Sequence, residues 1–479
     1  MKYLKVLSLA AFSLVLFSCS TTEDGWISLY DGNSLEGWTA SEHADSWKID
    51  KGVIVTGGER SHLFYTGDVL DHQFKNFEFS VDVKTTPNSN SGVYIHTAFQ
   101  EDDWPRQGYE CQVLNSSGEG DHVERKMSGS IYAVRNMWKS VQADNQWYTY
   151  RIKVVGKTIQ TYINDMLVVE YTEPEVLWRP EGWEGRKLNP AGGTFAFQCH
   201  DPKSVVAYKN IKVKPLADDL PTPGTPPADL VFEEQIVRLS TANFPLIDFH
   251  THLKGGLTRE EALAHARTYG FTYGIAVNCG LKMGFESDEE LTAYLDAFEP
   301  TPLAWHAMQA EGREWLELFS AENRNRFDYV FTDAMTWTNK NGVRQRLWIP
   351  EETDIGDPQD FMDQLVDNIV QVVTTEPIDI HVNPTYLPAE IADQYDALWT
   401  DARIDRMVKA LAESGVALEI NNRFRIPSAT IIKKAREAGV KFTFGTNNGG
   451  AEDLGRMDYA IEMIDVCGLT PQDMWYPEG

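Results

Sequence analysis

The sequence predicts two folded domains, an all-β antiparallel sandwich followed by an α/β barrel, and three observations support this prediction. Residues 26–216 consist of short strand-like segments separated by turn signals, without helical periodicity. Residues 216–229, LADDLPTPGTPPAD, contain four prolines and one glycine, a composition typical of a stiff, extended linker. From residue 246 onward, strands alternate with amphipathic helices, which indicates βα units around a parallel sheet.

The composition is that of a globular, acidic protein. The chain has 479 residues, enough for two or three domains. Its hydrophobic content of 42% and charged content of 24% are ordinary for folded proteins. The formal net charge of −28 argues against a nucleic-acid partner, because the phosphates would be repelled.

Residues 1–19 have the features of a lipoprotein signal peptide. Lys2 and Lys5 form a short basic region before the apolar run Val6–Phe17, which is too short to span a bilayer as a mature helix. The box Leu16-Phe17-Ser18-Cys19 makes Cys19 the predicted lipidation site. We therefore expect an exported bacterial lipoprotein, periplasmic or at the outer membrane or cell surface, with the lipid as its only membrane contact. A plain secretory signal is the alternative.

The first domain is assigned to residues 20–216, and its strands are short and regularly spaced. Strands of this kind without helical periodicity predict an antiparallel sandwich or jelly roll. The predicted strands are Lys48–Val55, Phe77–Lys84, Gly92–Ala98, Gly108–Asn115, Trp147–Val155, Thr158–Asn164, Thr194–His200 and Ala207–Val213.

Three of these strands combine an apolar face with a polar face, because alternate side chains of a strand point to opposite sides. The apolar faces predict buried free thiols at Cys111 and Cys199, with a disulfide between them as the alternative. The polar faces suit a sugar-binding cleft, with a plain solvated sheet face as the alternative. They carry Tyr94 and His96, Glu110 and Gln112, and Gln198 and His200.

The linker is assigned to residues 217–232 and the second domain to residues 233–479. Two helix starts, Thr258-x-x-Glu261 and Ser287-x-x-Glu290, have the spacing of a capping box. Seven βα units predict a parallel barrel of the TIM kind that is one unit short. The predicted strands are Leu246–Phe249, Tyr273–Val277, Leu303–His306, Tyr329–Thr332, Ile378–Val382, Ala417–Ile420 and Lys441–Phe444.

The first barrel strand ends in a His-x-His pair, His250 and His252. Residues two apart in a strand share a face, so both imidazoles are expected at the barrel mouth, where active sites of this architecture form. Such a pair is a common way to hold a divalent metal ion. Further candidates at later strand ends are His306 or Glu311, Asp333, His381 and Glu419.

Six motifs follow one another along the first domain: Leu29–Trp38, Asn90–Ile95, Gly108–Leu114, Ser128–Tyr132, Phe197–His200 and Tyr208–Ile211. Through them, residues 26–216 resemble the 3-keto-disaccharide hydrolase family, which includes 3-keto-glucoside 1,2-lyases and 3-keto-2-hydroxyglucal hydratases. The resemblance implies a concanavalin-like jelly roll. It also implies action on glycosides whose C3 hydroxyl has been oxidised to a ketone.

The chemistry implied by this resemblance needs few groups. A C3 ketone acidifies the C2–H, so a base can remove that proton, after which the C1 aglycone leaves and water adds back. We assign Glu110 and His200 as base and acid. Arg125 and Lys126 offer positive charge near the enolate. Candidates for binding sugar hydroxyls or the enolate oxygen are Asn90, Tyr94, His96, Gln112, Tyr132 and Gln198.

Four segments of the second domain carry a second resemblance: Asp248–His252, Glu311, Ile380–Pro384 and Leu418–Asn421. Through them, residues 240–470 resemble the polymerase-and-histidinol-phosphatase (PHP) superfamily of metal-dependent phosphoesterases. This resemblance implies a distorted seven-stranded barrel with two or three metal ions.

The second domain departs from the PHP pattern at two places. Val277-Asn278-Cys279 stands where the family has Thr-Asp-His, and Thr446-Asn447-Asn448-Gly449 stands where it has Ser-Asp-Ala-His. One histidine and an Asp/His pair are therefore missing. We expect at most a single divalent metal ion and no organic cofactor; the alternative is a degenerate barrel whose histidines are hydrogen-bonded structural groups. The predicted ligands are His250, His252, Glu311 and His381.

Two classes of function stay open at this level. One is a carbohydrate-active hydrolase or lyase that cleaves 3-keto-glycosides. The other is a non-catalytic sugar-binding jelly roll attached to a metal-dependent PHP-like hydrolase barrel. The carboxylate of Glu110 favours the enzyme, because proton abstraction needs a base and sugar binding does not. In both, the expected partner is a 3-keto-sugar or another carbohydrate.

Overall fold

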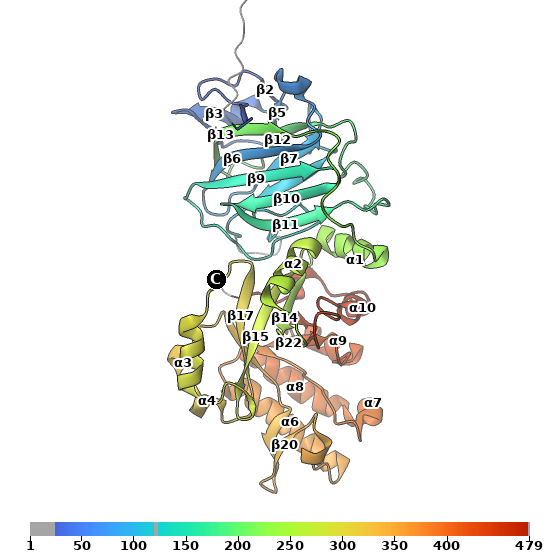
Figure 1. Cartoon of the computed structure of the whole chain (residues 1–479). Helices are drawn as coiled ribbons and strands as arrows, with labels where there is room; N and C mark the ends of the chain where they lie inside the picture. Colours follow the sequence, from blue (N-terminus) through green and yellow to red (C-terminus); the bar gives the residue numbers. More distant parts are fainter. Residues whose placement is uncertain (1–23, 119–122, 478–479) are drawn as a thin grey trace, which may run out of the picture.

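The computed structural model describes residues 24–118 and 123–477 of the chain. The predicted signal peptide and the predicted lipidation site Cys19 lie outside the described residues. Figure 1 shows two domains, a β-sandwich and an α/β barrel, with the helices α1 (Leu230–Thr241) and α2 (Arg259–Tyr269) at their boundary. The predicted order of an all-β domain followed by an α/β domain is confirmed.

The first domain is a sandwich of two antiparallel sheets. Aromatic side chains of both sheets meet between them, as where the rings of Phe79 and Phe195 lie 4.5 Å apart between centroids. The larger sheet has the order β11 (Met166–Thr172), β10 (Thr158–Ile163), β9 (Tyr148–Val155), β6 (Phe77–Thr85), β13 (Val206–Pro215), β4 (Val53–Thr56) and β3 (Trp47–Asp50), and β1 (Ile27–Ser28) pairs with β13.

The smaller sheet carries the polar faces predicted from the sequence. Its three central strands and β8 are buried along their whole length, because one face packs on the core and the other is covered by loops. The strand order is β2 (Trp38–Ala40), β5 (Ser61–Tyr65), β12 (Thr194–Cys199), β7 (Ser91–Thr97) and β8 (Tyr109–Val113).

The strand predictions for this domain need two corrections. The segment Lys48–Val55 is a hairpin, β3 and β4, because Lys51 and Gly52 adopt positive φ angles of 49° and 82°. The strands β1, β2, β5 and β11 were not predicted. The cysteines of the described residues, Cys111, Cys199, Cys279 and Cys467, are free and buried, as predicted for the first two.

The linker lies against the sandwich before α1 begins. Lys157 N donates to Thr222 Oγ1 at 3.1 Å, and Gly224 N donates to Thr158 Oγ1 at 3.1 Å. Asp229 caps α1 by accepting hydrogen bonds from two of its first backbone N–H groups. The helix thus starts inside the segment predicted as linker, residues 217–232.

The second domain is the predicted seven-stranded parallel barrel. Pairing between its first two strands closes it, and a short antiparallel strand, β16 (Met283–Gly284), is added at β15. The barrel order is β14 (Ile247–Thr251), β23 (Phe442–Gly445), β22 (Ala417–Asn421), β21 (Ile380–His381), β18 (Tyr329–Thr332), β17 (Ala304–Ala310) and β15 (Thr272–Gly280).

Helices surround the barrel strands, and both predicted helix starts are confirmed: the side chains of Thr258 and Ser287 accept the backbone N–H three residues on.

No helix in the described ranges is long and apolar enough to cross a membrane. The remaining elements are α3 (Asp288–Ala297), α4 (Trp315–Leu318), α5 (Ala321–Arg324), α6 (Pro358–Thr375), α7 (Tyr395–Leu398), α8 (Asp401–Ser414), α9 (Ala429–Glu437), α10 (Asp458–Cys467), the hairpin β19 (Thr336–Thr338) and β20 (Arg344–Arg346), and the 3-10 turns η1 (Ala44–Ser46), η2 (Val69–His72), η3 (Pro350–Glu352), η4 (Ala392–Gln394) and η5 (Pro471–Asp473).

The two domains share a buried interface. Arg135 of the sandwich is fully buried and forms an ion pair with Glu233 of α1 at 2.5 Å. Its Nε donates to the carbonyl oxygen of Thr268 at 2.5 Å, and Trp138 Nε1 donates to that of Gly270 at 3.0 Å. Because these groups have exchanged water for partners in the other domain, the relative position of the domains is fixed by directional contacts.

Candidate functional site

A cavity of about 1170 Å³ borders the polar face of the smaller sheet. Seven of the eight residues predicted as catalytic or substrate-binding in the first domain line it. They are Asn90, Tyr94, Glu110, Gln112, Tyr132, Gln198 and His200.

Glu110 is the buried acid of this cavity, with 8% of its surface exposed. It lies opposite Tyr94 in the β7–β8 pairing, and Tyr94 OH donates to its Oε2 at 2.8 Å. Gln198 Nε2 donates to its Oε1 at 2.7 Å. Burial raises the pKa of Glu110, while the charge of Arg186 acts in the opposite direction. The carboxylate is thus held in place and made more basic than an exposed one.

Two amide side chains next to Glu110 present unused acceptors. Gln112 Nε2 donates to Asn90 Oδ1 at 3.0 Å, and Gln198 Nε2 also lies 3.1 Å from Tyr94 OH. The Oε1 atoms of Gln112 and Gln198 are buried and have no hydrogen-bond partner among the described residues. Buried acceptors without partners are costly, so these oxygens are suited to receive hydroxyl groups of a ligand.

His200 lies on the rim, just after β12. Its Nδ1 is 2.7 Å from Asp201 Oδ2, and its ring lies 5.1 Å from the Trp104 ring between centroids. With Nδ1–H donating to the aspartate, the Nε2 atom is the one left to exchange a proton with a ligand.

Arg186 and Trp183 line the cavity from the loop before β12, and the sequence did not identify them. The Arg186 guanidinium lies 5.4 Å from the ring centroids of both Tyr94 and Trp183. Its Nη1 atom is buried without a hydrogen-bond partner among the described residues. A positive charge of this kind next to Glu110 suits a ligand that becomes negative. The signal in the sequence is the aromatic and cationic segment 178–186, WRPEGWEGR.

His62 of β5 is a second residue that the sequence missed. It lies opposite Gln198 in the β5–β12 pairing, and its ring centroid is 5.5 Å from those of Tyr94 and Trp104. Burial lowers its pKa to about 3, so the ring is neutral at neutral pH. It packs behind the cavity wall.

His96 is the predicted substrate-binding residue that does not line the cavity. Its backbone φ of 52° ends the strand alternation, and the ring turns into the sandwich. Its Nε2 lies 3.0 Å from the carbonyl oxygen of Lys75, and Asn189 N donates to its Nδ1 at 3.2 Å. Burial lowers its pKa to about 4. His96 is therefore a neutral structural residue that joins three chain segments.

The charged pair predicted next to Tyr132 divides into two roles. Arg125 lines the cavity, whereas Lys126 is buried and lies 3.0 Å from Glu124 Oε1. Tyr132 OH donates to Glu124 Oε2 at 2.8 Å. The charge of Lys126 is therefore matched locally, and Arg125 is the member of the pair that can face a ligand.

The histidines at the barrel mouth, His250, His252 and His381, are buried, and His250 Nε2 and both ring nitrogens of His381 have no hydrogen-bond partner among the described residues. His250 Nδ1 donates to Glu419 Oε1 at 2.6 Å, while burial and the neighbouring His250 hold the pKa of His252 well below its usual range. Burial and the nearby Asp333 carboxylate raise the pKa of Glu311. Within residues 24–118 and 123–477, no three His, Cys, Asp or Glu side chains are placed to hold a metal ion.

Two asparagines at positions that depart from the PHP pattern, Asn278 and Asn448, form hydrogen bonds at the barrel mouth, and so does Asn383 of a matching segment. Asn278 Nδ2 donates to Glu311 Oε1 at 3.2 Å, and Asn448 Oδ1 accepts the backbone N–H of His252 at 2.7 Å. Asn383 N donates to Glu419 Oε2 at 2.7 Å. Amide groups thus bind Glu311 Oε1 and Glu419 Oε2, whereas Glu311 Oε2 is buried without a partner among the described residues. The described structure therefore does not bring the four predicted ligands into one metal-binding group.

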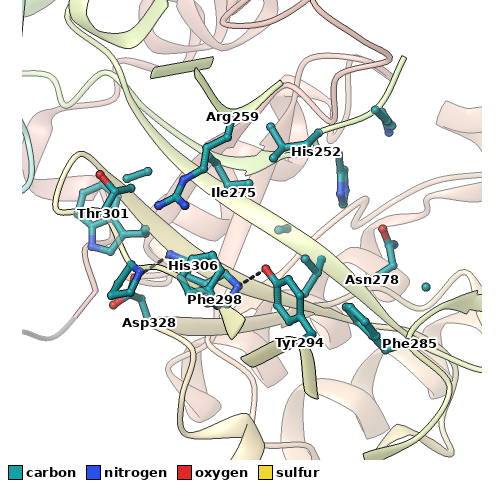
Figure 2. Close-up of a pocket in the computed structure, with 18 of the residues that line it drawn as sticks. His252, Arg259, Ile275, Asn278, Phe285, Tyr294, Phe298, Thr301, His306 and Asp328 are labelled. Atoms are coloured by element: carbon teal, nitrogen blue, oxygen red, sulfur yellow. Dashed lines mark hydrogen bonds between the residues drawn. The ribbon is translucent and has the colours of Figure 1, made fainter. Parts of the chain in front are cut away.

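His306, the alternative candidate at the third barrel strand, lines a second cavity that His252 also borders. Figure 2 shows it in this cavity, of about 610 Å³, together with Tyr294 and Phe298 of the α3 region. The rings of His306 and Phe298 are stacked 3.8 Å apart, and Tyr294 OH lies 2.9 Å from His306 Nε2. Its partners are aromatic, and burial lowers its pKa to about 4.

A curated protein is similar to part of this chain. A relative from Bacteroides thetaiotaomicron, a 3-keto-disaccharide hydrolase, is 25% identical over 187 residues, which are 34% of this chain and 64% of the relative. The chain therefore spans somewhat less than two thirds of that relative.

Solved structures also align with the first domain. A Parabacteroides distasonis protein, provisionally described as a glycosyl hydrolase, is 21% identical with a TM-score of 0.36, covering 42% of this chain and 99% of that one. The carbohydrate binding module CBM66 from Bacillus subtilis is 12% identical with a TM-score of 0.26, covering 37% of this chain and 95% of that one.

One family model matches the chain, over residues 25–214, and its description is 3-keto-alpha-glucoside-1,2-lyase-like domain. The PHP resemblance of residues 240–470 stays a prediction, although the seven-stranded barrel that it implied is present. The resemblance predicted for residues 26–216 is confirmed: this part of the chain matches the model of the 3-keto-alpha-glucoside-1,2-lyase-like domain.

Proposed function

We propose that the first domain cleaves 3-keto-glycosides by removing the proton at C2 of the oxidised sugar. The observation that supports this most strongly is Glu110, a buried carboxylate with a raised pKa in a cavity large enough for a disaccharide. Its two oxygens are oriented by Tyr94 and Gln198, so a lone pair is presented in a fixed direction.

The proposed reaction needs no reactant besides the substrate and water. Glu110 takes the C2 proton, and the electron pair of the C2–H bond forms the enolate with the C3 oxygen. The enolate collapses to the C3 ketone, a C1=C2 double bond forms, and the aglycone leaves C1 with its bonding pair and receives a proton. Water then adds its hydroxyl to C1 and a proton to C2. The net result is hydrolysis of the glycosidic bond.

Each proposed role follows from a position in the cavity. Arg186 carries the positive charge that stabilises the enolate, because its buried Nη1 has no other partner among the described residues. His200, held through Nδ1 by Asp201, donates the proton to the leaving group. The acceptor oxygens of Gln112 and Gln198 receive sugar hydroxyls.

The decisive experiment compares a 3-keto-glucoside with the same unoxidised glucoside. We expect turnover of the oxidised sugar only, because without the ketone the C2–H is too weakly acidic. The Glu110→Gln variant keeps the shape of the site but lacks the base. It should bind the substrate and lose about 10²–10⁴-fold in kcat. Exchange of the C2 hydrogen with deuterated solvent should accompany turnover in the wild type.

Glu173→Gln is the matched control. Glu173 is also buried with a raised pKa and accepts hydrogen bonds from Tyr109 OH and from Leu188 N, yet it does not line the cavity. It should keep full activity per folded molecule. Equal hydrolysis of both sugars, or an active Glu110→Gln variant, would refute the mechanism. Binding without turnover would support the non-catalytic sugar-binding module.

A further inference from the structure

The sugar cavity is lined by residues of both domains. Glu110 and Gln198 represent the jelly-roll part of the lining, whereas Lys441, Trp475 and Tyr476 belong to the barrel domain. The second domain therefore does more than follow the first one along the chain, since it completes the enclosure of the proposed active site.

The end of the barrel that borders the cavity is the one that does not carry the His250 and His252 pair. Lys441 directly precedes β23, and Gly415 lies shortly before β22, so both mark the amino ends of parallel strands. His252 follows β14 at the carboxyl end. In barrels of this kind the carboxyl end holds the active site, whereas the amino end serves stability. Contact with a ligand cavity is an additional role for this amino end.

The segment that reaches the cavity is anchored to the barrel. Met474 forms a parallel bridge with Phe442, and Trp475 N donates to the Phe442 carbonyl oxygen at 2.9 Å. The Trp475 ring packs edge-on against Phe249 and Tyr329, with centroid distances of 5.2 and 5.9 Å. Trp475 is thus held rigidly by the barrel core while it borders the cavity.

Tyr476, the next residue, is held from the opposite side by the jelly roll. The guanidinium carbon of Arg125 lies 3.8 Å from its ring centroid, a close cation–π contact. The neighbouring Lys126 donates to Asn243 Oδ1, just after α1. Both contacts cross the domain boundary, so the ring of Tyr476 has a defined place beside the sugar cavity.

We propose that Tyr476, supported by Trp475, forms the subsite for the aglycone, and that this aglycone is a ring bound by its face. This inference rests on the proposed function of Glu110. The aglycone leaves C1, next to the C2 at which Glu110 acts, so it must occupy the cavity beyond the oxidised sugar. The cavity volume of about 1170 Å³ exceeds the usual range of small-molecule sites, roughly 300–1,000 Å³, and leaves room for a second ring.

The rest of the lining is suited to such a ring. Tyr132 and Trp183 have nearly parallel rings, with an interplanar angle of 15° and centroids 6.3 Å apart. Aromatic faces bind flat partners through the same dispersion contact, whether the partner is a phenolic ring or the C–H face of a sugar. A second sugar residue and a phenol are therefore the two sources of this ligand chemistry.

The test uses the full chain and three 3-keto-glucosides, with methyl, phenyl and glucosyl aglycones. Tyr476→Ala should lower kcat/KM roughly tenfold for the ring aglycones and leave the methyl glycoside unchanged. Tyr476→Phe keeps the ring and should restore the wild-type ratio. A larger effect with the phenyl or with the glucosyl substrate identifies which ring the subsite prefers.

Trp147→Ala is the matched control, because Trp147 also lies under a cation, Lys209 Nζ at 4.2 Å, but does not line the cavity. Arg125→Met provides a second variant should Tyr476→Ala fold poorly, since it removes the charge that fixes the Tyr476 ring. An equal loss for all three substrates, or no loss for any, would overturn the proposal.

Failure of the proposed function gives a different result. If the wild type turns over none of the three substrates, calorimetric binding of unoxidised methyl and phenyl glucosides tests the subsite alone. Tyr476→Ala should then weaken binding of the phenyl glucoside only. Equal affinities of the wild type and the variant for both glucosides would refute the subsite.

Discussion

The carboxylate of Glu110 occupies the space that any side chain at Gly92 would need: a Cβ built on Gly92 comes within 2.6 Å of Glu110 Oε1. The backbone of Gly92 does not adopt a positive φ, so a methyl group at this position would clash with the Glu110 side chain without straining the backbone. Glycine at this position thus makes room for the proposed base between β7 and β8.

Gly92→Ala should therefore impair catalysis while the sandwich still folds. The added methyl group pushes the carboxylate away from Tyr94 and Gln198, and a displacement of about 1 Å can cost about 10²-fold in rate. The measurement is kcat/KM together with thermal unfolding. Gly57→Ala is the control, because its nearest contact would be Val205 Cγ2 at 4.0 Å. An unimpaired Gly92→Ala enzyme would contradict the assignment of Glu110.

The pH dependence of the reaction should depend on Arg186. A general base works only when ionised, so kcat/KM is lost as the pH falls through the pKa of Glu110, which burial has raised. Arg186 lowers that pKa. In Arg186→Met the acid limb of the kcat/KM profile should move to higher pH, and kcat should fall as the enolate loses its positive partner.

Arg106→Met separates this effect from a general loss of charge. Arg106 also lines the cavity, but it is largely exposed and its Nη2 lies 3.1 Å from Asp103 Oδ2. Its removal should leave the acid limb where it is. An acid limb that stays fixed in Arg186→Met would show that Arg186 does not act on Glu110.

Stability should decrease in acid because His96 is buried in its neutral form. Its pKa is about 4 in the folded protein, compared with 6.5 as the ordinary value, so the unfolded chain binds more protons between these two pH values. The contribution of neutral His96 to the free energy of unfolding is fully present above pH 6.5. It declines as the pH falls toward 4, by up to about 3 kcal/mol.

The His96→Gln variant should show a weaker decline. Glutamine retains a donor and an acceptor for the Lys75 and Asn189 backbone but does not titrate. Urea unfolding at several pH values between 4 and 7 measures the change in slope. The exposed His43→Gln should leave the slope unchanged, whereas an unchanged slope in His96→Gln would contradict the neutral, buried assignment.

Metal content tests the barrel prediction directly. Because no three candidate ligands are placed together among the described residues, and Glu419 already accepts hydrogen bonds from His250 and from Asn383 N, we expect the full chain to retain substoichiometric metal after incubation with Zn²⁺ or Mn²⁺ and desalting. Elemental analysis is the measurement. One equivalent that disappears in a His250→Ala plus His252→Ala variant would instead support the single metal ion inferred from the PHP resemblance.

The sequence predicted the fold well where hydrophobic periodicity is strong. All seven barrel strands were found, since each is a short apolar run between helices of amphipathic pattern. The strand β5, Ser61–Tyr65, was missed because both of its faces are buried and the segment shows no alternation. Because β5 was not predicted, His62 was not identified either, and no local sequence pattern indicates its position.

The candidate site could be predicted from the sequence where the alternation of side chains along a strand alone determines which face a residue lies on. Glu110 and Gln198 follow the two-residue period and face the same cavity. His96 does not, because its positive φ rotates the side chain away, a feature set by tertiary contacts. Arg186 comes from a loop whose position depends on Arg179, which donates to the Arg186 carbonyl oxygen and to Tyr109 OH at 2.9 Å each.

The ion pair between Arg135 and Glu233 affects how the protein unfolds. Separating the domains would break this ion pair together with the hydrogen bonds from Arg135 to the Thr268 carbonyl oxygen and from Trp138 to the Gly270 carbonyl oxygen. Neither half is therefore independent of the other, even though a proline-rich segment joins them. The protein should melt in one cooperative transition, and cleavage within residues 217–229 should not by itself release two separate folded units.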